Sequence, residues 1–145
     1  MNATLMPIKI AIASDPKTHV VAGKATWQQL INKLQTFRVG EKRGPVFVPA
    51  DMPSGPRQQQ YVKAITILTY DIDNKDGDNK AIPDPLSLAE MVEVIRCAAL
   101  NSILYETHSS RPNHPRFRLL VQLAEPIATH VYKQQAVEFA KRLGF

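Results

Sequence analysis

The chain has 145 residues, is 44% hydrophobic and 21% charged, and carries a formal net charge of +5. This balance is typical of one soluble globular domain with a core of its own. No apolar run approaches the roughly 20 residues of a membrane span, and no secretory signal is visible, so we expect no membrane contact and a cytoplasmic location. The single cysteine, Cys97, excludes an internal disulfide, and the basic charge favours polyanionic partners.

The N-terminal part of the sequence predicts one strand and one helix, followed by a long connection. The segment Pro7–Ala13 (PIKIAIA) predicts the strand. Residues 25–37 predict the helix, because apolar side chains recur at helical spacing and Thr26 can form a capping box with Gln29. Residues 40–60 are rich in proline and glycine and predict an irregular connection.

From residue 62 onward the sequence predicts strand, helix, strand, strand and helix, at 62–72, 87–100, 103–107, 116–123 and 129–143. Ser87 and Glu90 form a capping box at the start of the first helix, and Gly144 is the expected stop of the second. This order is that of a split βαβ unit without its last strand. It indicates an α+β fold with an RRM-like antiparallel sheet, helices on one face, and an N-terminal βα extension.

We therefore expect a single domain over residues 1–145. Residues 1–60 would form the N-terminal βα unit and the long loop, and 61–145 the RRM-like core. Because the last strand of the unit is not found, we expect the sequence to be an N-terminal fragment of a longer protein.

The apolar pattern also predicts which side chains face the core. In the helix at 87–100 they are Leu88, Met91, Val92, Ile95 and Ala99, with Cys97 as a small core residue. In the strand at 116–123, alternation places Phe117, Leu119, Val121 and Leu123 toward the core. The same alternation turns the other set away from it: Arg116, Arg118, Leu120 and Gln122.

Two acids close the strand at 62–72. Asp71 and Asp73 lie on the same side of it, because side chains alternate along a strand. Two carboxylates on a rigid strand end form a site for Mg²⁺ or Mn²⁺, which prefer oxygen ligands and serve phosphate chemistry. The alternative is a strand that simply ends in a polar loop. A calcium loop of the EF-hand type does not fit, because Lys75 and Ile82 stand at its fifth and twelfth positions.

Basic residues fall on the strand expected beside this pair. In a split βαβ unit the first and third strands are antiparallel neighbours, so the end of one lies beside the start of the other. Asp71 and Asp73 would then lie near Arg116 and Arg118, if both pairs share the face that the helices leave open. Arginine suits phosphate because its planar fork can bind two oxygens at once. A solvated edge face is the alternative for the two arginines.

The loop at 108–115 joins two strands at the same end of the sheet. It adds polar side chains that could contact a triphosphate: His108, Ser109, Ser110, Arg111 and His114. The plain alternative for the histidines is a turn position beside a proline. The sequence thus predicts one site with metal-binding carboxylates on one strand and phosphate-binding cations on the next.

Segments of this sequence, taken in order, carry a family resemblance. They are LTYDID at 68–73, YETHS at 105–109, PRFRL at 115–119, LAEP at 123–126 and AKRLGF at 140–145. Together they resemble the archaeo-eukaryotic primase superfamily, and most closely the primase or primase-polymerase domains of phage and plasmid replication proteins. The resemblance covers roughly residues 25–145.

The resemblance implies a nucleotidyltransferase site on an RRM-like sheet. Asp71 and Asp73 match the first motif and would bind two divalent metal ions. The second motif contacts the phosphates of the incoming nucleotide and maps onto His108, Ser109, His114, Arg116 and Arg118. Its usual Ser-x-His reads SSR at 109–111 here. The third motif is an aspartate on a strand expected just after residue 144, and a two-metal site without it should be weak or inactive.

We therefore expect a primase-like domain that joins NTPs or dNTPs on a DNA template, with a helicase domain or subunit in the parent protein. Metal ions would lower the charge barrier to attack of a 3′-hydroxyl on the α-phosphate. Lys42, Arg43 and Arg57, near the long connection, could follow the template backbone.

Two other functions stay open from the residues alone. A metal-dependent 3′–5′ exonuclease also starts from a strand with paired acids, and would draw its further acids from Glu90, Glu93 and Glu138. A non-catalytic RRM-like module would bind single strands by stacking bases on aromatic side chains. The outward face of the strand at 116–123 carries no aromatic residue, which counts against an ordinary RRM.

Overall fold

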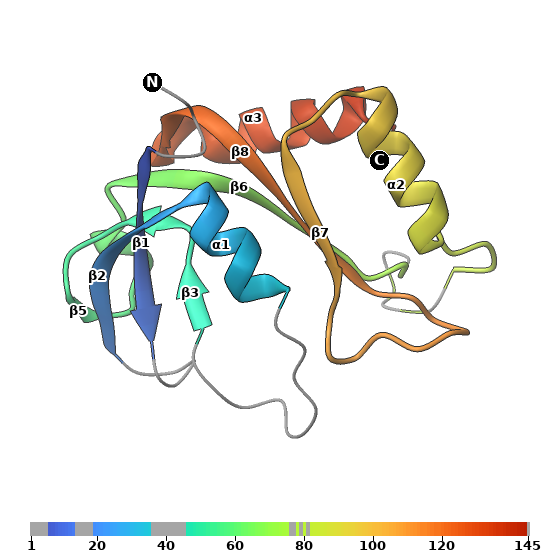
Figure 1. Ribbon diagram of the computed structural model, residues 1–145, viewed down its shortest axis with the longest axis horizontal. Helices are drawn as coiled ribbons and strands as arrows, with labels where there is room; N and C mark the ends of the chain where they lie inside the picture. The colour runs from blue at the N-terminus through green and yellow to red at the C-terminus, as the bar shows by residue number, and fades with distance from the viewer. Residues whose placement is uncertain are drawn as a thin grey trace.

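The computed structural model describes residues 6–13, 19–35, 46–75, 78, 80 and 82–144. In this part of the chain, two four-stranded antiparallel sheets and three α-helices form an α+β fold, as the sequence predicted. Figure 1 shows the two sheets side by side, with helix α1 (Trp27–Leu34) between them.

The first sheet is N-terminal and has the strand order β3-β1-β2-β5. Its strands are β1 (Pro7–Ala13), β2 (His19–Thr26), β3 (Val46–Val48) and β5 (Gly55–Pro56). Strand β1 is as predicted, and the Thr26–Gln29 capping box starts α1 as predicted. The sequence did not predict β2, nor the short strands within 46–56 where it indicated an irregular connection.

The second sheet has the order β4-β6-β8-β7 and contains the predicted split βαβ unit. Its strands are β4 (Ala50–Asp51), β6 (Ala64–Ile72), β7 (Ser102–Glu106) and β8 (Phe117–Ala128). Helices α2 (Leu88–Cys97) and α3 (Thr129–Arg142) complete the unit. Strand β8 lies between β6 and β7 and is antiparallel to both, as the topology required.

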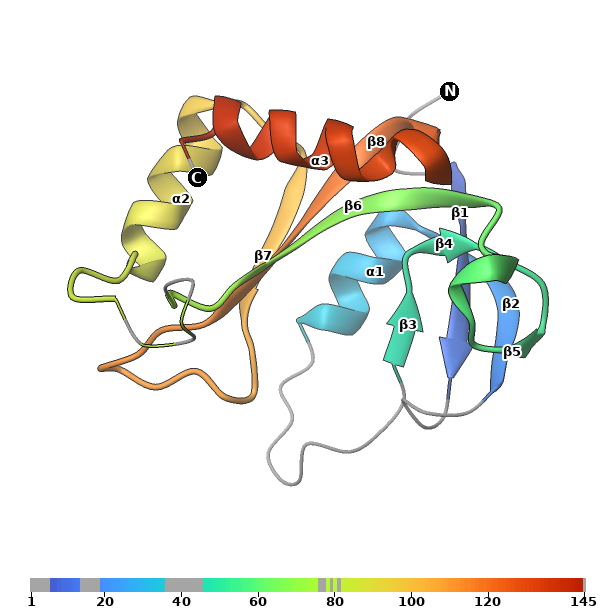
Figure 2. The same ribbon diagram turned by 180° about the vertical axis from the view of Figure 1, so that it is seen from behind.

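The outer edge of β6 is only partly covered. Strand β4 pairs with its first residues, through Ala50 with Ile65 and Asp51 with Ala64. Beyond this pairing, no strand of the described residues lies along that edge of β6. Figure 2 shows β6 in front of the other strands of its sheet, with α3 above it.

The two faces of this sheet are covered by different elements. Helices α2 and α3 lie over one face, where Leu68, Leu119 and Val121 form an apolar cluster. Helix α1 and strand β1 cover part of the opposite face. The prediction that Leu120 faces away from the core is therefore wrong. Leu120 is fully buried on that face, because the N-terminal unit packs against it.

Helix α2 has a narrower buried stripe than the sequence indicated. Met91 is fully buried, and Ile95 packs against the cluster of Leu68, Leu119 and Val121, so both point inward as predicted. Three other residues expected to point inward are exposed: Leu88, Val92 and Ala99. Cys97 is also exposed rather than a core residue, because two residues of helix turn it about 200° from Ile95. No helix in the described part of the chain is long and apolar enough to cross a lipid bilayer.

Candidate metal and phosphate site

The predicted neighbours Asp71 and Arg118 face each other across β6 and β8. They are register partners, and Tyr105 of β7 is the register partner of Arg118 on the other side. Directly opposed residues of antiparallel strands lie on the same face of a sheet. Asp71, Arg118 and Tyr105 therefore form one row across the sheet, on the face opposite α2 and α3.

An ion pair joins the first two residues of this row. The Nε of Arg118 donates a hydrogen bond to Oδ1 of Asp71 at 2.6 Å. Both side chains remain about half exposed, at 42% for Arg118 and 54% for Asp71. The contact is therefore open to solvent and to a ligand.

The environment of Arg118 keeps its guanidinium charged. Burial alone lowers the pKa of Arg118, but hydrogen bonds and charge interactions with Asp71 and Tyr105 outweigh burial, so the pKa is raised. Arginine is already charged at all ordinary pH values. Arg118 is thus a permanent cation held between a carboxylate and a phenol.

Asp73 lies at the end of β6, and a histidine from the neighbouring loop contacts its backbone. The Nε2 of His114 lies 2.7 Å from the carbonyl oxygen of Asp73. Because a carbonyl oxygen only accepts hydrogen bonds, Nε2 is the donor in this contact. The carboxylate of Asp73 stays on an exposed residue. In this structure His114 fixes the backbone that presents the second acid.

Arg116 directly precedes β8 and lies two residues before Arg118 in the chain. Its Nε is buried and has no hydrogen-bond partner among the described residues. Such a buried donor is costly unless a partner is supplied. A bound anion is one group that could supply such a partner.

The loop between β7 and β8 is a compact hairpin, as predicted. Arg111 and His114 exchange two backbone hydrogen bonds of 2.9 and 3.1 Å. The Oγ of Ser110 donates to Glu106 and accepts from the backbone N–H of Arg116. Ser110 thus has a structural role at the start of β8.

The remaining loop candidates lie at the same end of the sheet. His108 is exposed, and its carbonyl accepts a hydrogen bond from Nη1 of Arg111 at 3.1 Å. Ser109 is half-buried. The loop therefore carries both residues at the end of the sheet where Asp71 and Arg118 lie.

Sequence reasoning missed Asn74, which ties the two loops of the site together. Its Nδ2 donates to the carbonyls of Leu86 and Pro115 at 3.2 and 2.8 Å, and its Oδ1 accepts from the N–H of Leu86 at 3.0 Å. Asn74 is buried and has a φ of 52°. Asparagine tolerates this left-handed conformation better than most residues. An asparagine two residues after the end of a strand was the signal that could have found it.

The donor set fits an oxygen-preferring divalent cation, though only as a partial site. Asp71 and Asp73 offer two exposed carboxylates at one strand end, and Mg²⁺ commonly uses one or two carboxylates together with water and substrate phosphates. Within the described residues, no group of three or more histidine, cysteine, aspartate or glutamate side chains comes together. Asp76 lies outside the described residues, and Asp78 is exposed in its loop.

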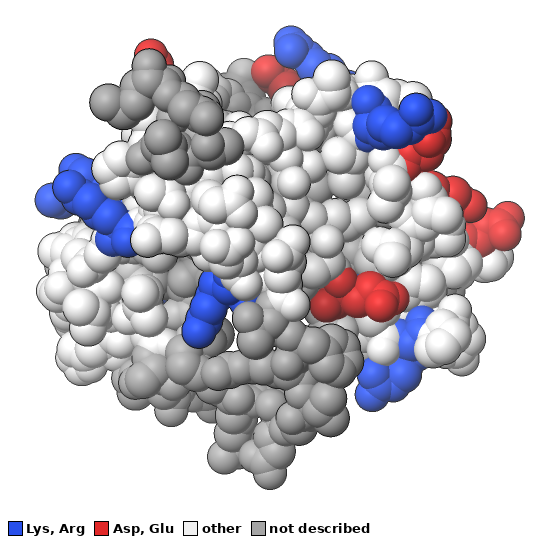
Figure 3. Space-filling view, viewed as in Figure 1, with Lys and Arg blue, Asp and Glu red and all other residues white. Residues whose placement is uncertain are grey.

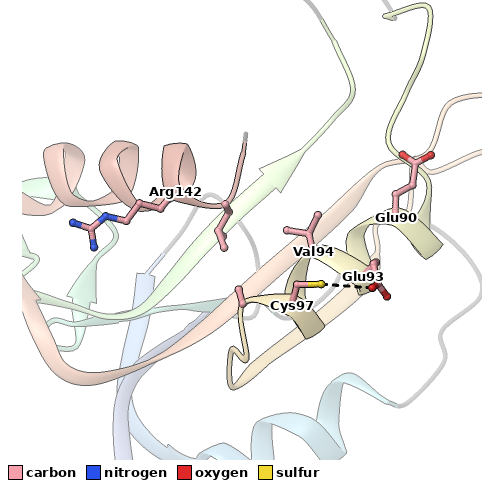
Figure 4. Close-up of a pocket in the computed structure, with 7 residues that line it drawn as sticks. Glu90, Glu93, Val94, Cys97 and Arg142 are labelled. Carbon is pink, nitrogen blue, oxygen red and sulfur yellow. Dashed lines mark hydrogen bonds between the residues drawn. The ribbon is translucent and has the colours of Figure 1, made fainter.

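A hollow between α2 and the end of α3 is separate from this site. It is lined by Glu90, Glu93, Val94, Cys97, Ala98, Arg142 and Leu143. Figure 4 shows the Sγ of Cys97 directed at Glu93, while the guanidinium of Arg142 points away from both. Hydrogen bonding to Glu93 raises the pKa of the Cys97 thiol, which disfavours the reactive thiolate.

The charges on the face seen in Figure 1 do not form a continuous basic area. Figure 3 shows blue and red side chains interspersed over the described atoms of that face. Lys42 and Arg43, which were expected to follow a template backbone, lie outside the described residues.

Comparison with protein families gives one match. The family described as the VapE N-terminal domain matches residues 39–145. The matched region contains the whole split βαβ unit, including every residue of the candidate site. Neither the curated proteins nor the solved structures gave a match. The chain belongs to the VapE N-terminal domain family, a domain of phage and plasmid replication proteins.

Proposed function

We propose that this domain is a nucleotidyltransferase of the primase or primase-polymerase type, acting in phage or plasmid DNA replication. The observation that carries the proposal is the contact between Asp71 and Arg118 at the exposed end of the sheet. A carboxylate suited to a divalent cation and a guanidinium suited to phosphate stand side by side. A nucleoside triphosphate with its metal presents the complementary pair of charges.

The residues divide into two roles. Asp71 and Asp73 would hold Mg²⁺ or Mn²⁺, which supplies charge neutralisation for attack of a 3′-hydroxyl on the α-phosphate. Arg116 and Arg118 would orient the phosphates, and the buried, unpartnered Nε of Arg116 supports an anionic ligand here. Further phosphate contacts would come from the adjacent loop, through His108, Ser109 and His114.

The alternative of a nuclease is less well supported. It would need more acids near Asp71, and the candidates lie on α2 and α3: Glu90, Glu93 and Glu138. These helices cover the opposite face of the sheet. The acids are thus separated from Asp71 by the sheet itself.

A module that only binds single strands has one observation in its favour. Tyr105 lies on the same face as Arg118 and could stack on a base. It is half-buried, however, and packs against the cluster that contains Trp27 and Leu30. A metal-dependent nucleotidyltransferase would use both the carboxylate of Asp71 and the guanidinium of Arg118.

The test measures nucleotide binding and synthesis together. Binding of a non-hydrolysable triphosphate is followed by calorimetry with and without Mn²⁺, and incorporation of labelled nucleotides is followed on a single-stranded DNA template. We expect metal-dependent binding in the native protein, and at least a tenfold loss when Asp71 and Asp73 are both changed to Asn. Glu125→Gln removes one negative charge from an exposed residue far along β8 and should leave binding unchanged.

Other results would identify the alternatives. Degradation of labelled DNA with Mg²⁺ and without triphosphates would indicate a nuclease. Metal-independent binding of single strands, with no affinity for triphosphates, would indicate a binding module. Either result contradicts the proposed function.

A further inference from the structure

Arg118 occupies the position that a cation would take at Asp71. Its Nε lies 2.6 Å from Oδ1, which is one of the oxygens that a divalent ion would need. If the proposed function holds, Asp71 therefore already carries a counter-charge before metal arrives. Arg118 is also the residue expected to bind phosphate, and it cannot give its Nε to both partners at once.

We propose that Arg118 is an exchangeable counter-cation that couples metal binding to triphosphate binding. In the unliganded protein Arg118 neutralises Asp71. When Asp71 binds a divalent cation, Arg118 is displaced and turns its guanidinium to the phosphates. This inference rests on the proposed function and specifies how its two ligands depend on each other.

The geometry makes the exchange feasible. An ion pair with both side chains about half exposed is weak, of the order of 0–1 kcal/mol, because water screens it. A divalent ion carries twice the charge of a guanidinium and can displace it from a carboxylate. Arg118 also has a second partner in Tyr105, which can hold it on the same face after it leaves Asp71.

The consequence is a reciprocal coupling between the two ligands. While Arg118 is paired with Asp71, it competes with the metal ion for the carboxylate and cannot bind phosphate through its Nε. Either ligand alone must break the ion pair, whereas both together share that cost. Linkage then requires each ligand to raise the affinity of the other by the same factor.

The first test measures Mn²⁺ alone, without triphosphate, by electron paramagnetic resonance of the free ion. Arg118→Gln removes the competitor, and we expect the affinity for Mn²⁺ to rise about fivefold. Arg96→Gln is the matched control. Arg96 forms an exposed ion pair of 2.7 Å with Glu93 on α2, away from the site, and its loss should leave Mn²⁺ affinity unchanged.

The second test measures a non-hydrolysable triphosphate alone, in the presence of a chelator. Asp71→Asn releases Arg118, and we expect tighter binding by about fivefold or more. Asp73→Asn removes the same charge without releasing Arg118 and should have a smaller effect. Adding Arg118→Gln to Asp71→Asn should abolish the gain. This arm does not depend on the folding of the single Arg118 variant.

The outcomes separate this inference from the proposed function. Equal Mn²⁺ affinity in Arg118→Gln and Arg96→Gln, with binding still dependent on Asp71, would overturn the exchange while leaving the function standing. Equal gains from Asp71→Asn and Asp73→Asn would also overturn it. A native protein that binds neither Mn²⁺ nor triphosphate would overturn both.

Discussion

The two faces of the β6–β8–β7 sheet are built from alternate residues of the same strands, yet they end differently. On the face under α2 and α3, apolar packing continues to Ile72, the last residue of β6. On the opposite face the apolar packing ends at Leu120 and Tyr105, and the row of Tyr105 continues with Arg118 and Asp71. Folding therefore uses the whole of one face but only part of the other. The remaining part carries the Asp71–Arg118 ion pair.

The largest effect should come from the buried part of the site face. Leu120 is fully buried against Ile67, Trp27 and Leu30. We expect Leu120→Ala to lower the free energy of unfolding by about 3 kcal/mol, because it leaves a cavity in a packed core. Urea denaturation followed by circular dichroism measures this change.

Arg118→Gln is the control for that prediction. It lies two residues away on the same face, but its side chain is about half exposed. Loss of its ion pair should cost less than about 1 kcal/mol. Equal losses for the two variants would contradict the division of this face into a core part and a binding part.

Asn74→Ala should have the next largest effect. It removes three side-chain hydrogen bonds and places alanine at a φ of 52°. We expect a loss of about 2 kcal/mol in the free energy of unfolding, because partly buried backbone groups of Leu86 and Pro115 lose their partner. Asn74→Gly keeps the backbone conformation accessible and should be less destabilising than alanine. Native-like stability of the alanine variant would show that the two loops do not depend on this residue.

The parts of this fold that the sequence predicted depend on local signals or on topology. The capping boxes at Thr26 and Ser87 are local, and both are present. The pairing of Asp71 with Arg118 is long-range, but the order of strands and helices leaves β6 and β8 as neighbours. Given that order, the register follows from matching the end of one strand to the start of the other.

The parts that the sequence did not predict depend on contacts between distant segments. The burial of Leu120 requires α1 to pack across the face that was expected to stay open. Strand β2 lacks a clear alternation, since it contains Ala22, Gly23 and Lys24, and becomes a strand by pairing with β1. Asp71 and Arg118 were predicted to be neighbours. Their direct ion pair is a side-chain detail that periodicity cannot give.

Removing the helix caps on the two sides of the sheet should have smaller effects on stability, and about equal ones. The Oγ of Ser87 accepts from the N–H of Glu90 at 3.1 Å in α2, and Thr26 accepts from Gln29 at 3.1 Å in α1. We expect Ser87→Ala and Thr26→Ala each to cost about 1 kcal/mol. Thermal denaturation measures both. A much larger loss for Thr26→Ala would show that α1 is the less stable of the two covers.

The smallest effect should come from Tyr70, on the face under α3, and should appear only at high pH. Burial, with a contribution from Tyr132, raises the pKa of Tyr70 to about 12, and its hydroxyl donates to the carbonyl of Ala136 at 2.6 Å. An unfolded tyrosine has a pKa of about 10. Below pH 10 both states are neutral, so the full contribution to stability is present. Between pH 10 and 12 the unfolded state ionises first, and stability falls.

Tyr70→Phe isolates this contribution. Between pH 7 and 9 the variant should differ from the native protein by a constant offset, which reports the lost hydrogen bond. Between pH 10 and 12 the offset should shrink, on the order of 1 kcal/mol or less because the ring is partly exposed. Denaturant titrations from pH 7 to 12 measure both the offset and its decrease. An offset that stays constant to pH 12 would contradict the assignment, since it would mean that Tyr70 ionises equally in both states and that the packing under α3 does not protect it.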